Sequence, residues 1–411
     1  MKDVLVIGGG PAGLTVARTL ANRGAAVVLV ERSESLGGRA REWTCKGLVE
    51  CRNCGVCFAI DRASEVAACD DIEVMLLSEV SAAQRTEQGY SVRIKTMPRY
   101  VTDDCIGCGK CADVCPVEGK AIFPPTGSGR PRTYWIDRGR CLHFRKAKCD
   151  KCAAVCPTKA VDYEERARNV RREVAAIVIA TGIEPVEAAD VTRLGCGTLK
   201  DVMSSVEVEK MLNADGRLRR PSDGRQPKKI AVIQCVGSRS VKQGVEYCSK
   251  FCCKYATKIC QLLLDIDPGL NIDFYFMDLR TLYEPHDEFK QWAKGKKTVR
   301  LIRSMPAAVF EGKEGRVAVR AASEADMEIM ETEYDLVILS VGMRPQGATA
   351  ELAKGLGVLT DPMGFAVHQE TLEKNGVFVC GAVTAPMDIE EVAVRATALA
   401  ARMAISAEAR R

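Results

Sequence analysis

Two segments of the chain share the order of apolar and polar runs that is typical of a strand, a turn, a helix and a second strand. The first segment covers residues 1–33 and contains the apolar run VLVI, and the second covers residues 228–276 and contains KIAVIQCV. Short continuous apolar runs indicate strands buried on both faces, as in parallel sheets covered by helices. The pattern therefore predicts an α/β protein with two doubly wound domains of the dinucleotide-binding type.

The turn after the first strand is rich in glycine and predicts a nucleotide site. Gly8 makes the tight turn, Gly10 lets the backbone approach a pyrophosphate, and Gly13 lets the helix pack closely on the strand. Glu31 closes the second strand, where a carboxylate accepts hydrogen bonds from ribose hydroxyls. The residues assigned to this site are Gly8, Gly10, Pro11, Ala12, Gly13, Glu31 and Arg32.

Further motifs favour the flavin dinucleotide FAD. LGGRA resembles the second glycine pair of FAD-binding, disulfide-reductase-type flavoproteins, and AAIVIATGIEP resembles their strand with an A-T-G turn. GVFVCGAV stands where their last flavin-contacting strand is expected, but Ala382 replaces the usual aspartate. The helix that starts near Asp388 would aim its positive N-terminus at the flavin ring. The residues assigned to these motifs are Gly37, Gly38, Arg39, Ala180, Thr181, Gly182, Gly381, Ala382, Asp388 and Ile389.

The second predicted domain carries cysteine where the first carries glycine. Its first strand ends at Cys235, and Cys248, Cys252 and Cys253 are expected to begin the next helix. Positions 248 and 252 are one helical turn apart, so three thiolates can converge on the loop that holds the fourth. Four thiolates suit an iron–sulfur cluster. The alternative is that these cysteines are small buried residues without a ligand.

An insertion between two parts of the flavin domain contains paired cysteine runs. The first run has the C-x2-C-x2-C-x3-C-P order of bacterial ferredoxins, and the second widens the first gap to seven residues. In this order the fourth cysteine of each run binds the cluster of the other run. We therefore assign one 4Fe-4S cluster to Cys105, Cys108, Cys111 and Cys156, and its neighbour to Cys141, Cys149, Cys152 and Cys115. Two zinc sites are the alternative, but the paired Cys-Pro endings have no role around isolated zinc ions.

A further cysteine group follows the second glycine pair. The segment WTCKGLVECRNCGVC contains a C-x2-C-x2-C core formed by Cys51, Cys54 and Cys57, with Cys45 as the expected fourth ligand and Cys69 in reserve. A fourth 4Fe-4S cluster, a zinc site and unligated cysteines all remain open here. The cysteines without partners at ligand spacing are expected to be packing residues: Cys196, Cys260 and Cys380.

Composition bears on where the protein works. The chain has 20 cysteines in 411 residues and enters a strand without a charged-then-apolar leader, so we expect a reducing, cytoplasmic compartment. No apolar run approaches the roughly 20 residues that a membrane span needs. The net charge of +5 is modest, and the basic run 217–229 also contains Pro, Ser, Asp and Gly. We interpret that run as a solvated linker and expect no nucleic-acid partner.

Taken together, these motifs resemble the flavin-binding A subunit of heterodisulfide reductases over essentially the whole chain. The resemblance rests on QCVGSR, YCSKFCCKYA, the glycine motifs, the inserted ferredoxin module and the ending GAVTAPMDIEEV. In length the chain is similar to shorter relatives. These include the A subunit of the quinone-interacting membrane-bound oxidoreductase of sulfate reducers and subunits of benzoyl-CoA reductase complexes.

The resemblance implies an oxidoreductase component of anaerobic metabolism. Such a protein passes electrons between FAD, three to four 4Fe-4S clusters and partner subunits, with electron bifurcation in some members. The implied partners are other heterodisulfide reductase-like subunits and a donor such as a ferredoxin or a hydrogenase or dehydrogenase subunit. A homodimer and a peripheral membrane association through partners are compatible with it. We assign no catalytic side chain, because the redox chemistry belongs to the cofactors.

The resulting domain plan has a flavin domain in three parts, at residues 1–98, 163–227 and 346–411. Residues 99–162 form an inserted α+β ferredoxin module, and residues 228–345 form a nicotinamide-type domain that carries a cysteine-ligated cluster. One rival is a self-contained NAD(P)H-dependent iron–sulfur flavoprotein oxidoreductase, against which the missing second glycine loop argues. Another is an assembly or redox-sensing protein whose clusters do not turn over.

Overall fold

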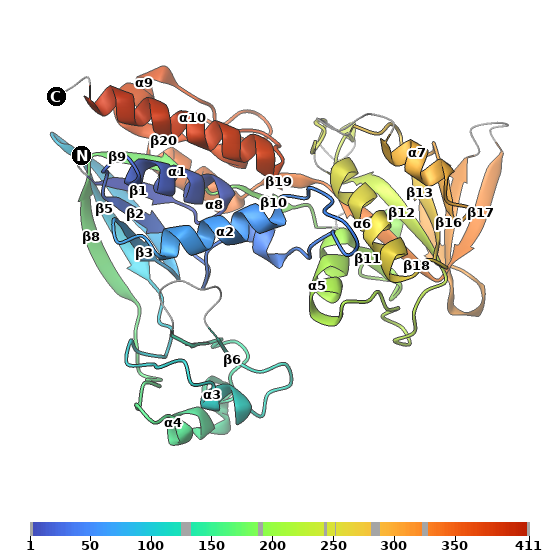
Figure 1. Ribbon diagram of the computed structural model, residues 1–411, viewed down its shortest axis with the longest axis horizontal. Coiled ribbons are helices and arrows are strands. Elements are labelled where there is room, and N and C mark those ends of the chain that lie inside the picture. Colours follow the sequence, from blue (N-terminus) through green and yellow to red (C-terminus); the bar gives the residue numbers. More distant parts are fainter. Residues whose placement is uncertain are drawn as a thin grey trace.

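A computed structural model describes residues 3–124, 133–187, 192–241, 245–250, 252–280, 288–322 and 328–408. The chain forms two lobes that lie side by side, and a smaller module projects from the first lobe, below it in the view of Figure 1. Both lobes are built on parallel sheets covered by helices, so the predicted α/β class with two doubly wound domains is confirmed. Within the described part of the chain, every helix is too short or too polar to cross a bilayer.

The first lobe is built on a five-stranded parallel sheet. In spatial order its strands are β20 (Val377–Val379), β9 (Ala176–Ile179), β1 (Val4–Ile7), β2 (Val27–Val30) and β3 (Ile72–Met75). The sequences VLVI of β1 and VVLV of β2 are fully buried, as expected for strands covered on both faces. Helices α1 (Pro11–Ala21), α10 (Ile389–Glu408) and α2 (Val56–Ala67) cover one face, where they share an apolar core with the sheet.

The other face of this sheet is covered by a smaller antiparallel sheet. It consists of β4 (Ser78–Thr86), β5 (Gly89–Thr96) and β8 (Arg168–Val174), and Val92 and Ile94 pack against the strands of the parallel sheet. Helices α8 (Gly347–Gly355) and α9 (Glu370–Lys374) complete the lobe.

The projecting module leaves the first lobe between β5 and β8. Its elements are α3 (Lys110–Asp113), β6 (Ile122–Phe123), β7 (Trp135–Ile136), a π-helical turn at His143–Ala147, and α4 (Lys151–Val155). A β-bridge between Val101 and Val161 closes its base. In Figure 1, α3 and α4 lie at the end of the module that is farthest from the two lobes.

The second lobe repeats the plan of the first. Its parallel sheet has the order β11 (Val202–Ser204), β18 (Leu336–Val341), β12 (Lys229–Val236), β13 (Asn271–Tyr275) and β14 (Val299–Ile302). Helices α5 (Ser205–Asp215), α6 (Cys252–Ile266) and α7 (Glu288–Lys294) pack on one face. A hairpin sheet of β15 (Ala308–Glu311), β16 (Val317–Ala322) and β17 (Ile329–Tyr334) packs on the other.

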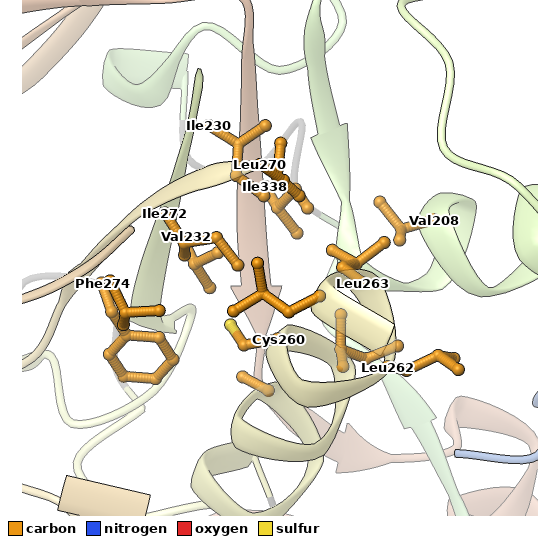
Figure 2. Packing of buried hydrophobic residues seen from close by; sticks show 14 of the residues in the cluster. Val208, Ile230, Val232, Cys260, Leu262, Leu263, Leu270, Ile272, Phe274 and Ile338 are labelled. Carbon is orange, nitrogen blue, oxygen red and sulfur yellow. The ribbon is translucent and has the colours of Figure 1, made fainter. Parts of the chain in front are cut away.

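The core between α6 and this sheet is apolar and includes one cysteine. Figure 2 shows Cys260 among the aliphatic side chains of Ile230, Val232, Ile272, Ile338 and Leu263. Cys260 is completely buried, in agreement with the expectation that it is a packing residue.

One domain boundary differs from the sequence plan, which placed residues 163–227 in the flavin domain. Strand β11 instead pairs in parallel with β18, with Val202 opposite Val337. Leu212 and Leu218 pack in the core of the second lobe. A three-residue strand is too short to show a periodic pattern, and its pairing partner lies more than 130 residues away in the chain, so local sequence could not locate this edge. The two lobes are joined by β10 (Ile183–Pro185) and β19 (Met343–Pro345), which pair antiparallel.

Candidate functional site

The glycine loop after β1 packs closely against its neighbours because glycine has no side chain. A Cβ atom on Gly13 would lie 1.8 Å from the carbonyl oxygen of Gly8, so α1 could not approach the strand with any larger residue. Gly8 itself has a φ of +108°, and its Cβ would lie 2.4 Å from the carbonyl oxygen of Ala180. The A-T-G turn after β9 therefore closes directly on the first loop.

The second glycine pair also lies against this loop. Gly37 and Gly38 both have positive φ, and a Cβ on Gly38 would lie 2.8 Å from the Cα of Gly10. Gly10 has no other atom within 4 Å of its Cβ position and faces the cavity described below. Its glycine character is therefore not explained by packing within the protein, as expected where a backbone must admit a ligand.

Glu31 anchors the end of β2 through both carboxylate oxygens. Oε2 accepts a hydrogen bond from the backbone N–H of Gly9 at 2.6 Å, and Oε1 accepts one from the N–H of Ser33 at 2.8 Å. The side chain is almost fully buried and lines the cavity. These bonds fix the carboxylate beside the loop while its remaining lone pairs stay available to a ligand.

The loops surround one cavity of about 720 Å³. This is within the range of about 300–1,000 Å³ that is usual for small-molecule and cofactor sites. Three of the residues assigned from the sequence, Gly13, Gly37 and Gly381, lie behind the wall. The assigned residues that line the cavity are Gly8, Gly10, Pro11, Ala12, Glu31, Arg32, Gly38, Arg39, Ala180, Thr181, Gly182, Ala382, Asp388 and Ile389.

Helix α10 begins at this cavity. The carboxylate of Asp388 accepts a hydrogen bond from the backbone N–H of Glu391 at 2.8 Å and so caps the helix. Asp388 and Ile389 line the cavity wall, as does Ala382 at the position where aspartate was expected from the resemblance. The N-terminal amides of a 20-residue helix thus border the site.

The second lobe provides a wall that the sequence analysis did not identify. Lys254, Tyr255 and Lys258 of α6 line the cavity. Lys258 is buried and donates a hydrogen bond to the carbonyl oxygen of Asn53 at 2.9 Å. Burial raises the pKa of Tyr255, whose hydroxyl donates to the carbonyl oxygen of Ser205 at 2.7 Å. The sequence signal that could have identified these residues is their position directly after the candidate ligands Cys252 and Cys253.

Three of the four candidate ligand cysteines of the second lobe come together. Cys235, next to the end of β12, and Cys252 and Cys253, at the start of α6, are all buried. Cys235 has a left-handed φ of 58°, which is strained for a non-glycine residue. A hydrogen bond from Cys252 lowers the pKa of Cys235 and lowers that of Cys253 to about 7. Donating these bonds, together with burial, raises the pKa of Cys252.

Cys248 does not lie on the helix as expected. Helix α6 begins at Cys252, and Lys250 before it has a φ of 62°, which a right-handed helix cannot contain. The buried Ser249 hydroxyl accepts a hydrogen bond from the backbone N–H of Met343 at 2.9 Å and holds this loop to β19. The sulfur of Cys248 accepts one from the N–H of Lys250 at 3.3 Å. The helical spacing argument for Cys248 was therefore wrong.

Cysteines of the two runs lie close to one another in the projecting module. Burial first, and then the charges of Cys115, Cys111, Cys141 and Cys149, raise the pKa of Cys152 to about 11. In the same way, burial and the neighbouring Cys105 and Cys108 raise the pKa of Cys111 to about 11. Cys115, the fourth cysteine of the first run, thus lies with the cysteines of the second run. The sulfur of Cys156 accepts a hydrogen bond from the backbone N–H of Ala160 at 3.2 Å.

The donor set suits iron–sulfur clusters better than zinc. Among the described residues, no group of three or more His, Cys, Asp or Glu side chains is arranged to hold a single metal ion. Zinc would draw four sulfurs to about 2.3 Å from one point, whereas a four-iron cube is bound through separate irons and spreads its ligands more widely. Neighbouring thiols without a single-ion geometry fit the second arrangement.

The loop with the N-terminal cysteines bridges the two lobes. Cys45 and Cys51 are exposed, Cys54 lines the cavity, and Cys57 lies in the first turn of α2. Cys69 follows the far end of this 12-residue helix, about 18 Å away at 1.5 Å per residue, so the structure does not bring it to the loop. Its sulfur instead accepts a hydrogen bond from Arg18 at 3.6 Å.

Ion pairs fix this loop to the second lobe. Lys46 and Glu209 form a fully buried ion pair between the loop and α5, and the backbone N–H of Thr44 donates to the same carboxylate at 2.9 Å. Arg52 pairs with Asp265 of α6 at 3.0 Å. No local pattern in the sequence signals these contacts, because the partners are more than 160 residues apart.

Comparison with known proteins extends these observations. Residues 6–64 match a family described as an NAD(P)-binding Rossmann-like domain, and residues 104–160 match a 4Fe-4S dicluster domain. The structure is similar to that of Lactococcus lactis thioredoxin reductase, with a TM-score of 0.51 and 15% identity over 99% of this chain and all of the other. At this identity the likeness shows the fold alone.

Curated relatives match nearly the whole chain. The A subunit of the H(2):CoB-CoM heterodisulfide,ferredoxin reductase of Methanothermobacter thermautotrophicus is 31% identical over 98% of this chain. An iron-sulfur A subunit of the CoB–CoM heterodisulfide reductase of Methanopyrus kandleri is 34% identical over 97% of it. The chain spans 63% of the length of each of these relatives. It is therefore related, over nearly all of its own length, to the A subunits of heterodisulfide reductases.

Proposed function

We propose that this chain is an oxidoreductase, the electron-transfer flavoprotein subunit of a heterodisulfide reductase-like complex. In this proposal one FAD exchanges electrons with three or four 4Fe-4S clusters. The observation that carries it is the position of α6. The helix begins with Cys252 and Cys253, and its next two residues, Lys254 and Tyr255, line the cavity. A cluster held by these sulfurs would stand at the wall of the flavin site.

The residues around the cavity fit FAD. Gly10 leaves open space beside the backbone where a pyrophosphate would lie, and Glu31 presents a fixed carboxylate for ribose hydroxyls. The capped N-terminus of α10 would favour negative charge on the ring system. When bound, FAD supplies the exchange between two-electron and one-electron chemistry. The protein would orient the FAD and exclude water from it.

The cysteines divide among the proposed clusters as follows. The module would hold one cluster through Cys105, Cys108, Cys111 and Cys156, and a second through Cys115, Cys141, Cys149 and Cys152. The second lobe would hold a third through Cys235, Cys248, Cys252 and Cys253. The bridging loop offers Cys45, Cys51, Cys54 and Cys57 for a fourth. The gathering of Cys115 with the second run supports the crossed assignment in the module.

The same proposal includes partners. The relative from Methanothermobacter is named for hydrogen, a heterodisulfide and ferredoxin, and it is one subunit of its enzyme. We infer that this chain also works with partner subunits and with a low-potential electron donor. The exposed end of the projecting module is one place where such a partner can approach a cluster (Figure 1).

Cofactor content tests the proposal. Anaerobically purified protein should contain one FAD and about twelve to sixteen iron atoms per chain, at four per cluster. Photoreduction should bleach the flavin and produce the paramagnetic signals of reduced clusters. A content of about eight irons per chain would show that the cysteine groups of the second lobe and of the bridging loop hold no cluster. Clusters that accept no electrons on the time scale of turnover would instead support an assembly or sensing role.

A further inference from the structure

The projecting module carries opposite charge at its two cysteine runs. Residues 103–118, which contain the first run, have four acidic side chains and a single lysine. Residues 138–151, which contain the first two cysteines of the second run, have six basic side chains and one aspartate. The two cysteine runs therefore differ in the charge of the side chains around them.

Half of these basic side chains belong to the segment that departs from ferredoxin spacing. Seven residues instead of two separate Cys141 from Cys149, and this longer connection contributes Arg145, Lys146 and Lys148. It forms the π-helical turn at His143–Ala147 and ends at Lys148 in a left-handed conformation. The extra length has thus placed positive charge directly beside a ligand cysteine.

Aromatic contacts hold this connection in a defined shape. The ring of His143 stacks on Tyr163 with centroids 3.7 Å apart and an interplanar angle of 8°. Phe144 packs against Tyr100 at 4.5 Å, and the guanidinium of Arg138 lies 5.2 Å from the ring of Phe144. These contacts pack the connection against the rest of the module.

The charged ends of this segment face solvent. Asp150, its one acidic residue, is bonded to Nδ1 of His143 at 3.0 Å. The guanidinium of Arg140 donates a hydrogen bond to the carbonyl oxygen of Glu118 at 3.0 Å. We name the exposed basic side chains the basic face: Arg138, Arg140, Arg145, Lys148 and Lys151.

We propose that the basic face is the docking surface for a small acidic electron-transfer protein. Its acidic surface would bring its own redox centre next to the cluster proposed at Cys115, Cys141, Cys149 and Cys152. One electron then passes from the reduced carrier to the oxidised cluster, with no bond formed or broken and no proton moved. This inference rests on the proposed function and adds the entry point and the charge of the partner. Complementary charge raises association rates by about 10- to 1,000-fold at low salt.

Stopped-flow mixing with a reduced, acidic two-cluster bacterial ferredoxin tests the docking surface on the intact holoprotein. The second-order rate should fall steeply as salt rises from about 20 mM to about 500 mM, because the Debye length shortens from roughly 20 Å to a few ångströms. Arg145→Glu should slow the reaction about tenfold at low salt. Lys110→Glu makes the same charge change at the acidic run and should leave the rate within about twofold.

Two controls separate the possible failures. Photoreduced deazaflavin, a small neutral reductant, should reduce the clusters of all three proteins equally, and failure to do so would overturn the proposed function itself. If deazaflavin works but the ferredoxin rate is insensitive to salt and to Arg145→Glu, the docking surface is wrong. Competition by a short DNA duplex at micromolar concentration would also overturn it, since the face would then bind nucleic acid.

Discussion

The two lobes share a sheet order and differ at the end of one strand. In the first lobe β1 lies between β2 and β9, and in the second β12 lies in the same position between β13 and β18. After β1, three residues (8–10) lead into α1, and glycines make that turn possible. After β12, fifteen residues (237–251) lead into α6, and cysteines stand at both ends of the connection.

The difference shows how one architecture can serve two kinds of ligand. A tight glycine turn brings backbone amides and a helix N-terminus to one point, as a pyrophosphate requires. A long connection between Cys235 and Cys252 gives up that convergence and opens room for sulfur side chains. The end of β1 lines the cavity between the lobes as a nucleotide cradle, whereas the second lobe lines it through Lys254, Tyr255 and Lys258 of α6, which follow the cysteines of the proposed electron relay.

The largest expected effect comes from changing the nucleotide end. Gly10→Glu places a side chain and a negative charge where the pyrophosphate would lie, so FAD content of the purified protein should fall below about a tenth of the wild-type value. Gly347→Glu is the control, because that glycine is exposed and has no atom within 4 Å of its Cβ position. Full yellow colour in Gly10→Glu would show that the loop is misplaced.

The cysteine end should respond in the opposite way. Cys252→Ser replaces a soft thiolate by a poor iron ligand, so we expect the loss of about four irons with FAD and the paired clusters of the module retained. Electron transfer through the reconstituted complex should collapse. Cys260→Ala is the matched control, since Cys260 lies on the same helix but is buried among aliphatic side chains. If the Cys252→Ser protein kept its full iron content and turnover, these cysteines would be core packing residues and not cluster ligands.

A smaller effect should follow from separating the lobes at the bridging loop. Glu209→Gln leaves the ammonium of Lys46 buried without its carboxylate, which should lower the free energy of unfolding by about 3 kcal/mol. The midpoint of urea unfolding measures this. Glu65→Gln removes two partly exposed ion pairs, with Arg62 and with Arg18, and should cost less than about 1 kcal/mol. Equal midpoints for the two variants would show that the buried pair does not fasten the lobes.

The smallest effect concerns thiols that no cluster is expected to use. Burial raises the pKa of Cys380 to about 12, so only about one thiol in 10⁴ is ionised at pH 8. After iron removal under native conditions, iodoacetamide should label the exposed Cys51 well before Cys380, as read by peptide mass spectrometry. The rate at Cys380 should rise tenfold per pH unit up to about pH 12. Comparable labelling of the two at pH 8 would contradict the packing role.

Features that depend on local spacing could be predicted from the sequence. The glycine loop, the second glycine pair and the cysteine runs each lie within about 30 residues, and the structure places the glycines where close approach requires them. The edge strand β11 and the Lys46–Glu209 pair join distant parts of the chain, so no local pattern announced them. The prediction that Cys248 lies on the helix was wrong for another reason. The backbone bends at Lys250, before α6 begins, and helical spacing alone cannot show such a bend.

The central claim is that the second lobe has exchanged a nicotinamide site for a cysteine site. Anaerobic addition of NADH or NADPH to the holoprotein, followed by flavin absorbance near 450 nm, tests it most directly. An excess of about tenfold over micromolar protein is enough to saturate a micromolar site. The account predicts that the flavin stays oxidised with either nucleotide and is bleached by photoreduced deazaflavin. Prompt bleaching by NADH or NADPH would contradict it, because a hydride donor would then bind where β12 ends at the cysteines.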